Sequence, residues 1–199
     1  MKIFNPYNIY YIYLSKIMKH RIFIAINLPD KIKRQLLDCK KRWNNLKVRW
    51  TKFENIHITL EFLGLIEYKK LRTVLEVTKK TAARIQPFDV RLNKIILGPD
   101  PAQAKMFWAT VMVGKPLLNL KDTLNKNLPE AGIEIKEERD FNPHITLARA
   151  RGNELKGKQT NVNLSRLGFK VESVEVMESR LLPGGARYKA IGSFMLGAC

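Results

Sequence analysis

Two residue types that build many small-protein sites are almost absent from this chain of 199 residues. It contains 2 cysteines, Cys39 and the final Cys199, and only 3 histidines. No Cys-x-x-Cys pair occurs, so neither a disulfide framework nor a cysteine zinc cluster is indicated. So few histidines also argue against a histidine-rich metal site. We therefore expect chemistry without a metal or cofactor, in a reducing compartment such as the cytoplasm.

Acidic residues are scarce relative to basic ones. Lysine and arginine number 36 against 18 aspartates and glutamates, which gives a net charge of +18. Such an excess attracts polyanions such as nucleic acids and makes their binding sensitive to salt. A lysine-rich proteome would produce the same composition without any such function. The charge supports a nucleic-acid partner but does not establish one.

The chain also lacks an apolar run that could cross a membrane. Residues 1–19 are rich in tyrosine and contain no acid, but Asn5, Pro6, Asn8 and Lys16 interrupt the apolar stretch. No small-residue cleavage site follows, which argues against a signal peptide. We expect residues 1–19 to be an extension, with Met18 as the natural start, and residues 20–199 to form one monomeric domain. N-terminal sequencing of protein made from its native message would test the start site.

The remainder alternates between strand-like and helix-like segments. Apolar runs with β-branched residues predict strands, and apolar stripes at helical spacing predict helices. The predicted helices span residues 31–45, 68–85 and 116–129, and residues 150–167 form a basic loop. The predicted strands span residues 21–28, 48–51, 56–63 (closed by Gly64), 88–97, 106–113, 133–135, 144–149, 169–181 and 187–196.

The most informative feature is a tetrapeptide that occurs twice. His57-Ile58-Thr59-Leu60 returns as His144-Ile145-Thr146-Leu147, and these two copies contain two of the three histidines. Side chains alternate along a strand, so histidine and threonine share one face while isoleucine and leucine pack on the other. A single copy would be explained by a strand with a satisfied polar pair. Two identical copies indicate a function.

The two copies also predict the architecture. Each half of the chain holds a strand, a helix and further strands around its motif. The simplest fold is a duplicated α+β unit with two lobes, in which two antiparallel sheets face a central groove and the helices lie outside. The two motif strands would then line that groove from opposite sides.

Two imidazoles across a groove form an acid–base pair that works near neutral pH. Thr59 and Thr146 would donate hydroxyl hydrogen bonds to an anion such as a phosphoryl group. Arg149 follows the second motif, and its guanidinium could bind a phosphate in a bidentate manner. In a regular strand Arg149 would point away from His144, so this assignment requires a bend in the strand.

Aromatic residues lie near both motif strands. Stacking a base on such a ring contributes roughly 1–3 kcal/mol, so these residues are candidates for binding a nucleotide. Packing in the core is the alternative for each of them. Trp50 and Phe62 are our candidates for the substrate site, and Phe53, Trp108 and Phe141 are the other rings near the motifs.

From Arg21 to about Leu196 the sequence resembles the 2H phosphoesterases, which are named for paired His-x-Thr-x motifs. It is most similar to the RNA 2′,3′-cyclic phosphodiesterases, also called 2′-5′ RNA ligases (LigT-like). The residues that carry this resemblance are the opening strand 21–25 with Leu28-Pro29, Arg49-Trp50, residues 54–60 with Phe62-Leu63-Gly64, residues 143–149, and Gly185-Ala186-Arg187-Tyr188.

The resemblance implies a bilobal fold and opening of a 2′,3′-cyclic phosphate at an RNA end, without metal, to leave a 2′-phosphomonoester. His57 would be the general acid that protonates the departing 3′ oxygen, and His144 the general base that activates water. Thr59, Thr146 and Arg149 would hold phosphate oxygens. A 5′-hydroxyl in place of water would instead join RNA ends through a 2′-5′ bond, without ATP.

Two other functions remain open at this point. The same site could act on 2′-5′ oligoadenylates or on small cyclic nucleotide phosphates. Alternatively, the protein could bind RNA ends without turnover, although a pure binder has no need of paired imidazoles.

Overall fold

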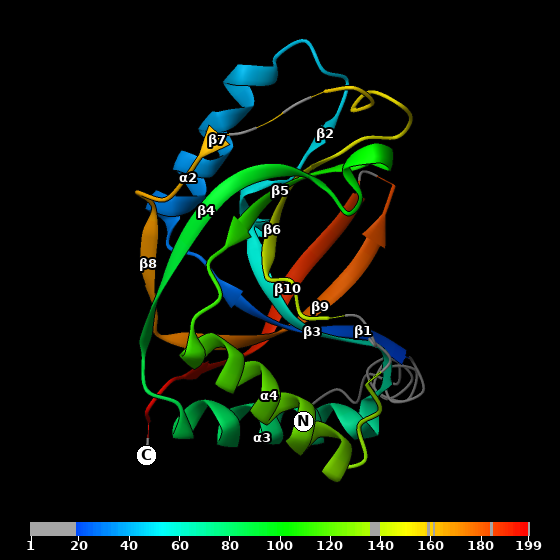
Figure 1. The fold of residues 1–199 in the computed structure, drawn as a ribbon. Coiled ribbons are helices and arrows are strands. Elements are labelled where there is room, and N and C mark those ends of the chain that lie inside the picture. The colour runs from blue at the N-terminus through cyan, green and yellow to red at the C-terminus, as the bar shows by residue number, and fades with distance from the viewer. Residues whose placement is uncertain (1–18, 136–139, 159, 161, 184, 199) are drawn as a thin grey trace, which may run out of the picture.

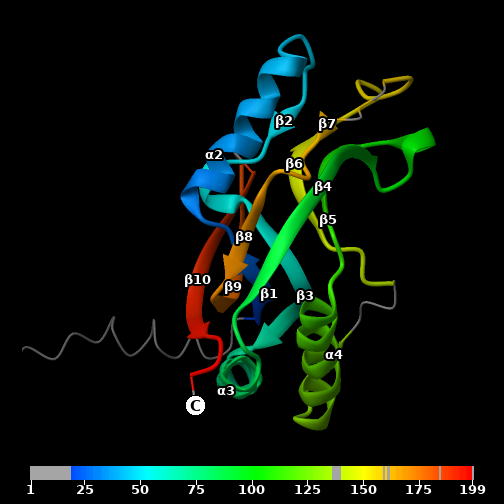
Figure 2. The same cartoon turned by 60° about the vertical axis from the view of Figure 1, so that its left-hand side comes forward.

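The computed structural model describes residues 19–135, 140–158, 160, 162–183 and 185–198. Two antiparallel sheets form the body of the protein, with α2 at one end and α3 and α4 at the other (Figures 1 and 2). This arrangement confirms the predicted α+β architecture. Of the predicted extension 1–19, residues 1–18, with the proposed start at Met18, lie outside the described residues, and Lys19 instead begins the first strand.

The first sheet has the strand order β10-β9-β1-β3. Its strands are β1 (Lys19–Asn27), β3 (His57–Glu67), β9 (Ser173–Leu182) and β10 (Gly185–Met195). The first motif therefore lies at the start of β3, the edge strand of this sheet. The predicted hairpin at the end of the chain is present, because β9 and β10 pair along their whole length.

The second sheet has the order β2-β6-β5-β4-β7, and β8 pairs with β4 beside it. Its strands are β2 (Arg49–Trp50), β4 (Phe88–Gly98), β5 (Met106–Val111), β6 (His144–Arg149), β7 (Val162–Asn163) and β8 (Gly168–Val171). The second motif occupies β6, between β2 and β5. Each motif thus belongs to a different sheet, as the duplication predicted.

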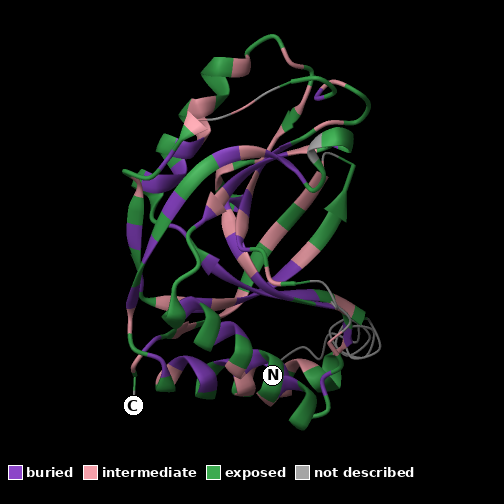
Figure 3. Ribbon diagram, in the orientation of Figure 1, coloured by how far each residue is buried: buried purple, intermediate pink, exposed green. Residues whose placement is uncertain are grey.

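Two of the three helices span nearly the predicted residues, but the first was predicted over 31–45 and its α-helical part ends at Asp38. The helices are α2 (Asp30–Asp38), α3 (Tyr68–Arg84) and α4 (Lys115–Glu130), and short 3₁₀ turns span Cys39–Trp43, Phe53–Asn55 and Pro101–Gln103. The helices bury one side each, for example through Leu117, Leu120 and Leu124 of α4. Their apolar stripes join the inner faces of the strands in one continuous core (Figure 3).

Several predicted strand boundaries were also wrong. Gly64 does not close the first motif strand: β3 continues to Glu67 because Gly64 adopts a positive φ of 69° and still pairs with Ile22 of β1. Residues 133–135 form no strand, although Ile133 is buried. The predicted strand 169–181 is divided at Glu172 into β8 and β9, which pair with different partners. Within the described residues no helix is long and apolar enough to cross a membrane.

Candidate active site

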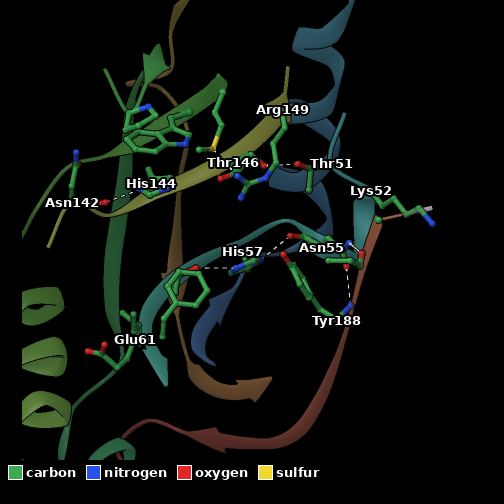
Figure 4. A pocket seen from close by; sticks show the side chains of 18 of the residues that line it. Thr51, Lys52, Asn55, His57, Glu61, Asn142, His144, Thr146, Arg149 and Tyr188 are labelled. Atoms are coloured by element: carbon green, nitrogen blue, oxygen red, sulfur yellow. Dashed lines mark hydrogen bonds between the residues drawn. The ribbon is translucent and has the colours of Figure 1, made fainter. Parts of the chain in front are cut away.

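A cavity of about 860 Å³ lies between the two sheets and contains both motifs. His57 and Thr59 enter it from β3, and His144 and Thr146 enter it from β6. Figure 4 shows the two histidines on opposite walls of this cavity. The fold therefore brings together two imidazoles and two hydroxyls that are far apart along the chain.

Both imidazoles are oriented in the same way. Nδ1 of His57 lies 2.8 Å from the carbonyl oxygen of Asn55, and Nδ1 of His144 lies 2.8 Å from that of Asn142. A carbonyl only accepts, so each Nδ1 carries the hydrogen and donates it. In the neutral state each ring then has Nε2 as its basic nitrogen, on the side away from the backbone. His57 Nε2 is 3.0 Å from the Thr59 hydroxyl.

An aromatic ring also supports each histidine. His57 packs against Phe23 and the edge of Tyr188, with ring centroids 5.0 Å and 5.3 Å away. His144 stacks on Trp108, with centroids 3.8 Å apart and planes at 23°. Trp108 also lies close to Gly98, where an added Cβ would lie 2.5 Å from the indole ring. These contacts restrict the tilt of both imidazoles.

The electrostatic environment opposes a charge on His57. Burial lowers the pKa of His57 to about 4, and His144, Lys33 and Arg149 act in the same direction. The hydrogen bond to Asn55 opposes this effect without reversing it. His57 of the free protein is therefore neutral at pH 7, and an anion near the ring would raise its pKa again.

Each motif strand contains a β-bulge at the same place. In β3 the register shifts between Thr59 and Glu61, and in β6 between Thr146 and Ala148. Each strand consequently buries two successive residues after the threonine, and the next side chain returns to the cavity face. The bulge in β6 is the bend that the assignment of Arg149 required. Arg149 and its counterpart in β3, Phe62, both line the cavity.

Thr51 fixes the second motif from the neighbouring strand. Its hydroxyl donates to the carbonyl oxygen of Thr146, and its amide donates to that of Leu147, both at 2.8 Å. The short β2 therefore pins the bulged part of β6, where Thr146 and Arg149 project into the cavity. This function of Thr51 was not predicted from the sequence.

Two further contacts at the site were missed. The Asn55 side chain donates to the carbonyl oxygen of Ala186 and accepts from the amide of Tyr188, so it joins the first motif to β10. Glu61, buried directly after the first motif, pairs with Lys121 of α4. The repeat itself held a signal for the first contact, because both copies extend backwards to Asn-x-His-Ile-Thr-Leu. No pattern in the sequence pointed to the second.

The candidate aromatic residues separate into different environments. Phe62 is 53% exposed and lines the cavity, and Phe141 lines it beneath Lys121, whose Nζ lies 5.5 Å from the ring centroid. Trp50 also borders the cavity, but its ring stacks on Phe107 in the core at 5.9 Å and 9°. Its packing on Phe107 does not remove Trp50 from the cavity lining, so a role in substrate binding stays a prediction. Phe53 does not line the cavity and lies instead beneath Lys33.

The third histidine has a separate partner. His20 of β1 places its Nδ1 2.7 Å from a carboxylate oxygen of Glu178, which belongs to the neighbouring strand β9. His20 does not line the cavity. Among the described residues, no group of three or more histidine, cysteine, aspartate or glutamate side chains is placed to hold a metal ion.

Comparison with known proteins identifies the class to which this fold and site belong. Residues 20–179 match the family model of the AKAP7 2′5′ RNA ligase-like domain. The chain belongs to this family and is a 2H phosphoesterase, as the paired motifs predicted. At the family level it is a phosphodiesterase.

Individual relatives agree with this assignment. The RNA 2′,3′-cyclic phosphodiesterase of Methanothermobacter thermautotrophicus is 28% identical over 90% of this chain and 100% of its own. That of Aeropyrum pernix is 32% identical over 64% of this chain and 72% of its own. Among solved structures, TT0787 of Thermus thermophilus has a TM-score of 0.81 at 24% identity, covering 89% of this chain and 98% of its own. Escherichia coli LigT complexed with 3′-AMP has a TM-score of 0.74 at 22% identity, with the same coverage.

Proposed function

We propose that this protein hydrolyses a 2′,3′-cyclic phosphate at the end of an RNA strand and leaves a 2′-phosphomonoester, without a metal ion. The observation that carries the proposal is the matched pair of imidazoles. Both are fixed as Nδ1–H tautomers by a backbone carbonyl, and both enter one cavity from opposite walls. The names of the relatives supply the substrate class.

The reaction needs one proton to be taken and one to be given. Water attacks phosphorus while Nε2 of His144 accepts its proton, and the bond from phosphorus to the 3′ oxygen breaks. Protonated His57 gives its Nε2 proton to that oxygen, which becomes the 3′-hydroxyl. Each such transfer typically contributes about 10²–10⁴-fold to the rate. If an RNA 5′-hydroxyl takes the place of water, the same steps form a 2′-5′ bond.

The side chains around the histidines suit the other parts of the substrate. Thr59 and Thr146 hold non-bridging phosphate oxygens, and Arg149, brought to this face by the bulge, neutralises their charge. Phe62 offers an exposed ring on which the terminal base stacks.

The test is product analysis on a short RNA that ends in a 2′,3′-cyclic phosphate, with EDTA present. We expect a 2′-phosphate product, with turnover abolished by His57→Ala while RNA binding stays within a few-fold. A 3′-phosphate product, dependence on an added metal, or parental rates in His57→Ala would contradict the proposal. Assaying 2′-5′ oligoadenylate and a small cyclic nucleotide phosphate in parallel separates the alternative substrates.

A further inference from the structure

Two arginines from neighbouring strands line the cavity. Arg49 of β2 and Arg149 of β6 are directly opposite partners in antiparallel strands, so their side chains lie on the same face of the sheet. Both line the cavity. Like charges in such a cross-strand pair destabilise a sheet. Their pairing therefore has a cost that the fold itself does not explain.

Within the described part of the chain, no carboxylate neutralises these cations. Neither arginine has an acidic group of those residues within 4.0 Å, and the Arg149 guanidinium donates instead to the sulfur of Met106. The side chain of Arg49 reaches towards β10. Its guanidinium lies against the backbone of Gly185, where an added Cβ would be 3.0 Å from Nη1, and Gly185 has a φ of 112°. Two arginines on one cavity surface, without a described carboxylate to neutralise them, are suited to binding an anion.

The position of this site relative to the motif suggests which anion it takes. Arg149 follows Thr146 by three residues, one of which is the extra residue of the bulge. The two residues are therefore about two strand positions apart, roughly 6–7 Å along β6. This separation is comparable to that between neighbouring phosphates in one nucleic-acid strand. A 2′,3′-cyclic phosphate is the 3′ end of its strand, so every other phosphate of the substrate lies on its 5′ side.

We propose that Arg49, beside Arg149, forms a second phosphate subsite that binds the phosphate 5′ to the terminal nucleotide. The inference rests on the proposed function and extends it. It makes the preferred substrate an RNA strand rather than a nucleoside 2′,3′-cyclic phosphate without a 5′-phosphate.

The smallest test compares two substrates that differ by a single phosphate. These are a nucleoside 2′,3′-cyclic phosphate with a free 5′-hydroxyl and the same compound with a 5′-phosphate. We expect the protein to prefer the second by at least about tenfold in kcat/KM, because charge-assisted hydrogen bonds are the strong ones. Arg49→Ala should remove most of this preference. Arg49→Lys should keep part of it, because lysine retains the charge without the guanidinium fork.

Arg166→Ala is the matched control. It removes the same charge from an exposed arginine that does not line the cavity, so it should leave the preference as it is. A short RNA with a cyclic end gives a second measurement. The slope of log KM against log salt should decrease by about 0.7 in Arg49→Ala, which is the value for neutralising one phosphate fewer on a single strand. Thermal unfolding checks that the variants are folded.

The outcomes distinguish failure of the second phosphate subsite from failure of the proposed phosphodiesterase function. If the parent protein opens neither substrate nor the RNA, the proposed function fails. If it opens all of them without a preference for the 5′-phosphate, or if Arg49→Ala slows both small substrates equally, the subsite is overturned and the function stands. A loss confined to the phosphorylated substrate and the RNA supports the subsite.

Discussion

At the scale of single residues, His57 combines two opposite requirements. In the proposed mechanism His57 is the general acid and must carry a proton, yet burial lowers its pKa to about 4. A substrate phosphate beside the ring favours the imidazolium and resolves the conflict. Binding of the substrate would then promote protonation of His57, whereas the ring would be neutral in the free protein.

This arrangement makes a prediction about titration. In an NMR titration, the His57 imidazole should protonate near pH 4 in the protein alone and at clearly higher pH with a nucleoside 2′-monophosphate bound. The alkaline limb of kcat should lie at higher pH than that of kcat/KM, since the former reports the bound complex and the latter the free enzyme. An unchanged pKa on binding would argue that His57 is not the acid.

The threonine hydroxyls allow a conservative test. Thr59→Val and Thr146→Val keep the branched shape and remove the donor to the phosphate. A hydrogen bond to a charged group contributes about 1.5–3 kcal/mol, so each change should lower kcat/KM by roughly 10- to 150-fold. Thr110→Val, on β5 opposite His144 and outside the cavity lining, is the control for removal of a hydroxyl. Parental activity in both motif variants would remove the hydroxyls from the proposed mechanism.

Gly98 supports His144 through Trp108. A methyl group at position 98 would meet the indole at 2.5 Å, and Trp108 cannot move away without pressing on His144. Gly98→Ala should therefore lower kcat about tenfold or more while circular dichroism shows a folded protein, because small displacements of a catalytic group are costly. A fully active Gly98→Ala variant would show that the Trp108 stack does not position His144.

At the scale of elements, the buried pair of Glu61 and Lys121 connects the first motif strand to α4. Lys121 also lies over Phe141, which directly precedes the Asn142 carbonyl that orients His144. The pair therefore links the two halves of the site through a strand, a helix and a loop.

Removing one member of this pair should lower the free energy of unfolding more than removing both members does. Lys121→Met takes away the ammonium group beside a buried carboxylate and should lower the free energy of unfolding by about 3 kcal/mol in urea titration. The double variant Glu61→Leu with Lys121→Met should recover part of that decrease, because the buried carboxylate is removed as well. Additive decreases in the double variant would show that the two side chains do not act as a pair.

At the scale of the whole molecule, the neutral His57 links stability to pH. Its pKa is about 4 when folded and about 6.5 when unfolded, so between these values the unfolded chain binds more protons. Stability should therefore fall as the pH drops from about 6.5 to 4, by at most about 3 kcal/mol. In urea titrations between pH 6.5 and 4, the His57→Gln variant should not show this part of the decrease in stability. A parallel pH profile in both proteins would contradict the link.

Much of this protein was determined by the sequence alone. Alternation along a strand placed histidine and threonine of each motif on one face, and the duplication predicted two sheets around a groove, because such patterns depend only on local geometry and burial. The elements 19–27, 68–84 and 115–130 follow from apolar periodicity in the same way.

Only the tertiary structure decided what depends on register and on contacts between distant segments. The bulges that bring Phe62 and Arg149 into the cavity arise from pairing with β1 and β5, and the motif strands alone do not encode them. The pairing of Arg49 with Arg149 and of Glu61 with Lys121 likewise joins residues 100 and 60 positions apart. Contacts of this kind leave no periodic signal along the chain, so they become visible only when the sheets and helices are assembled.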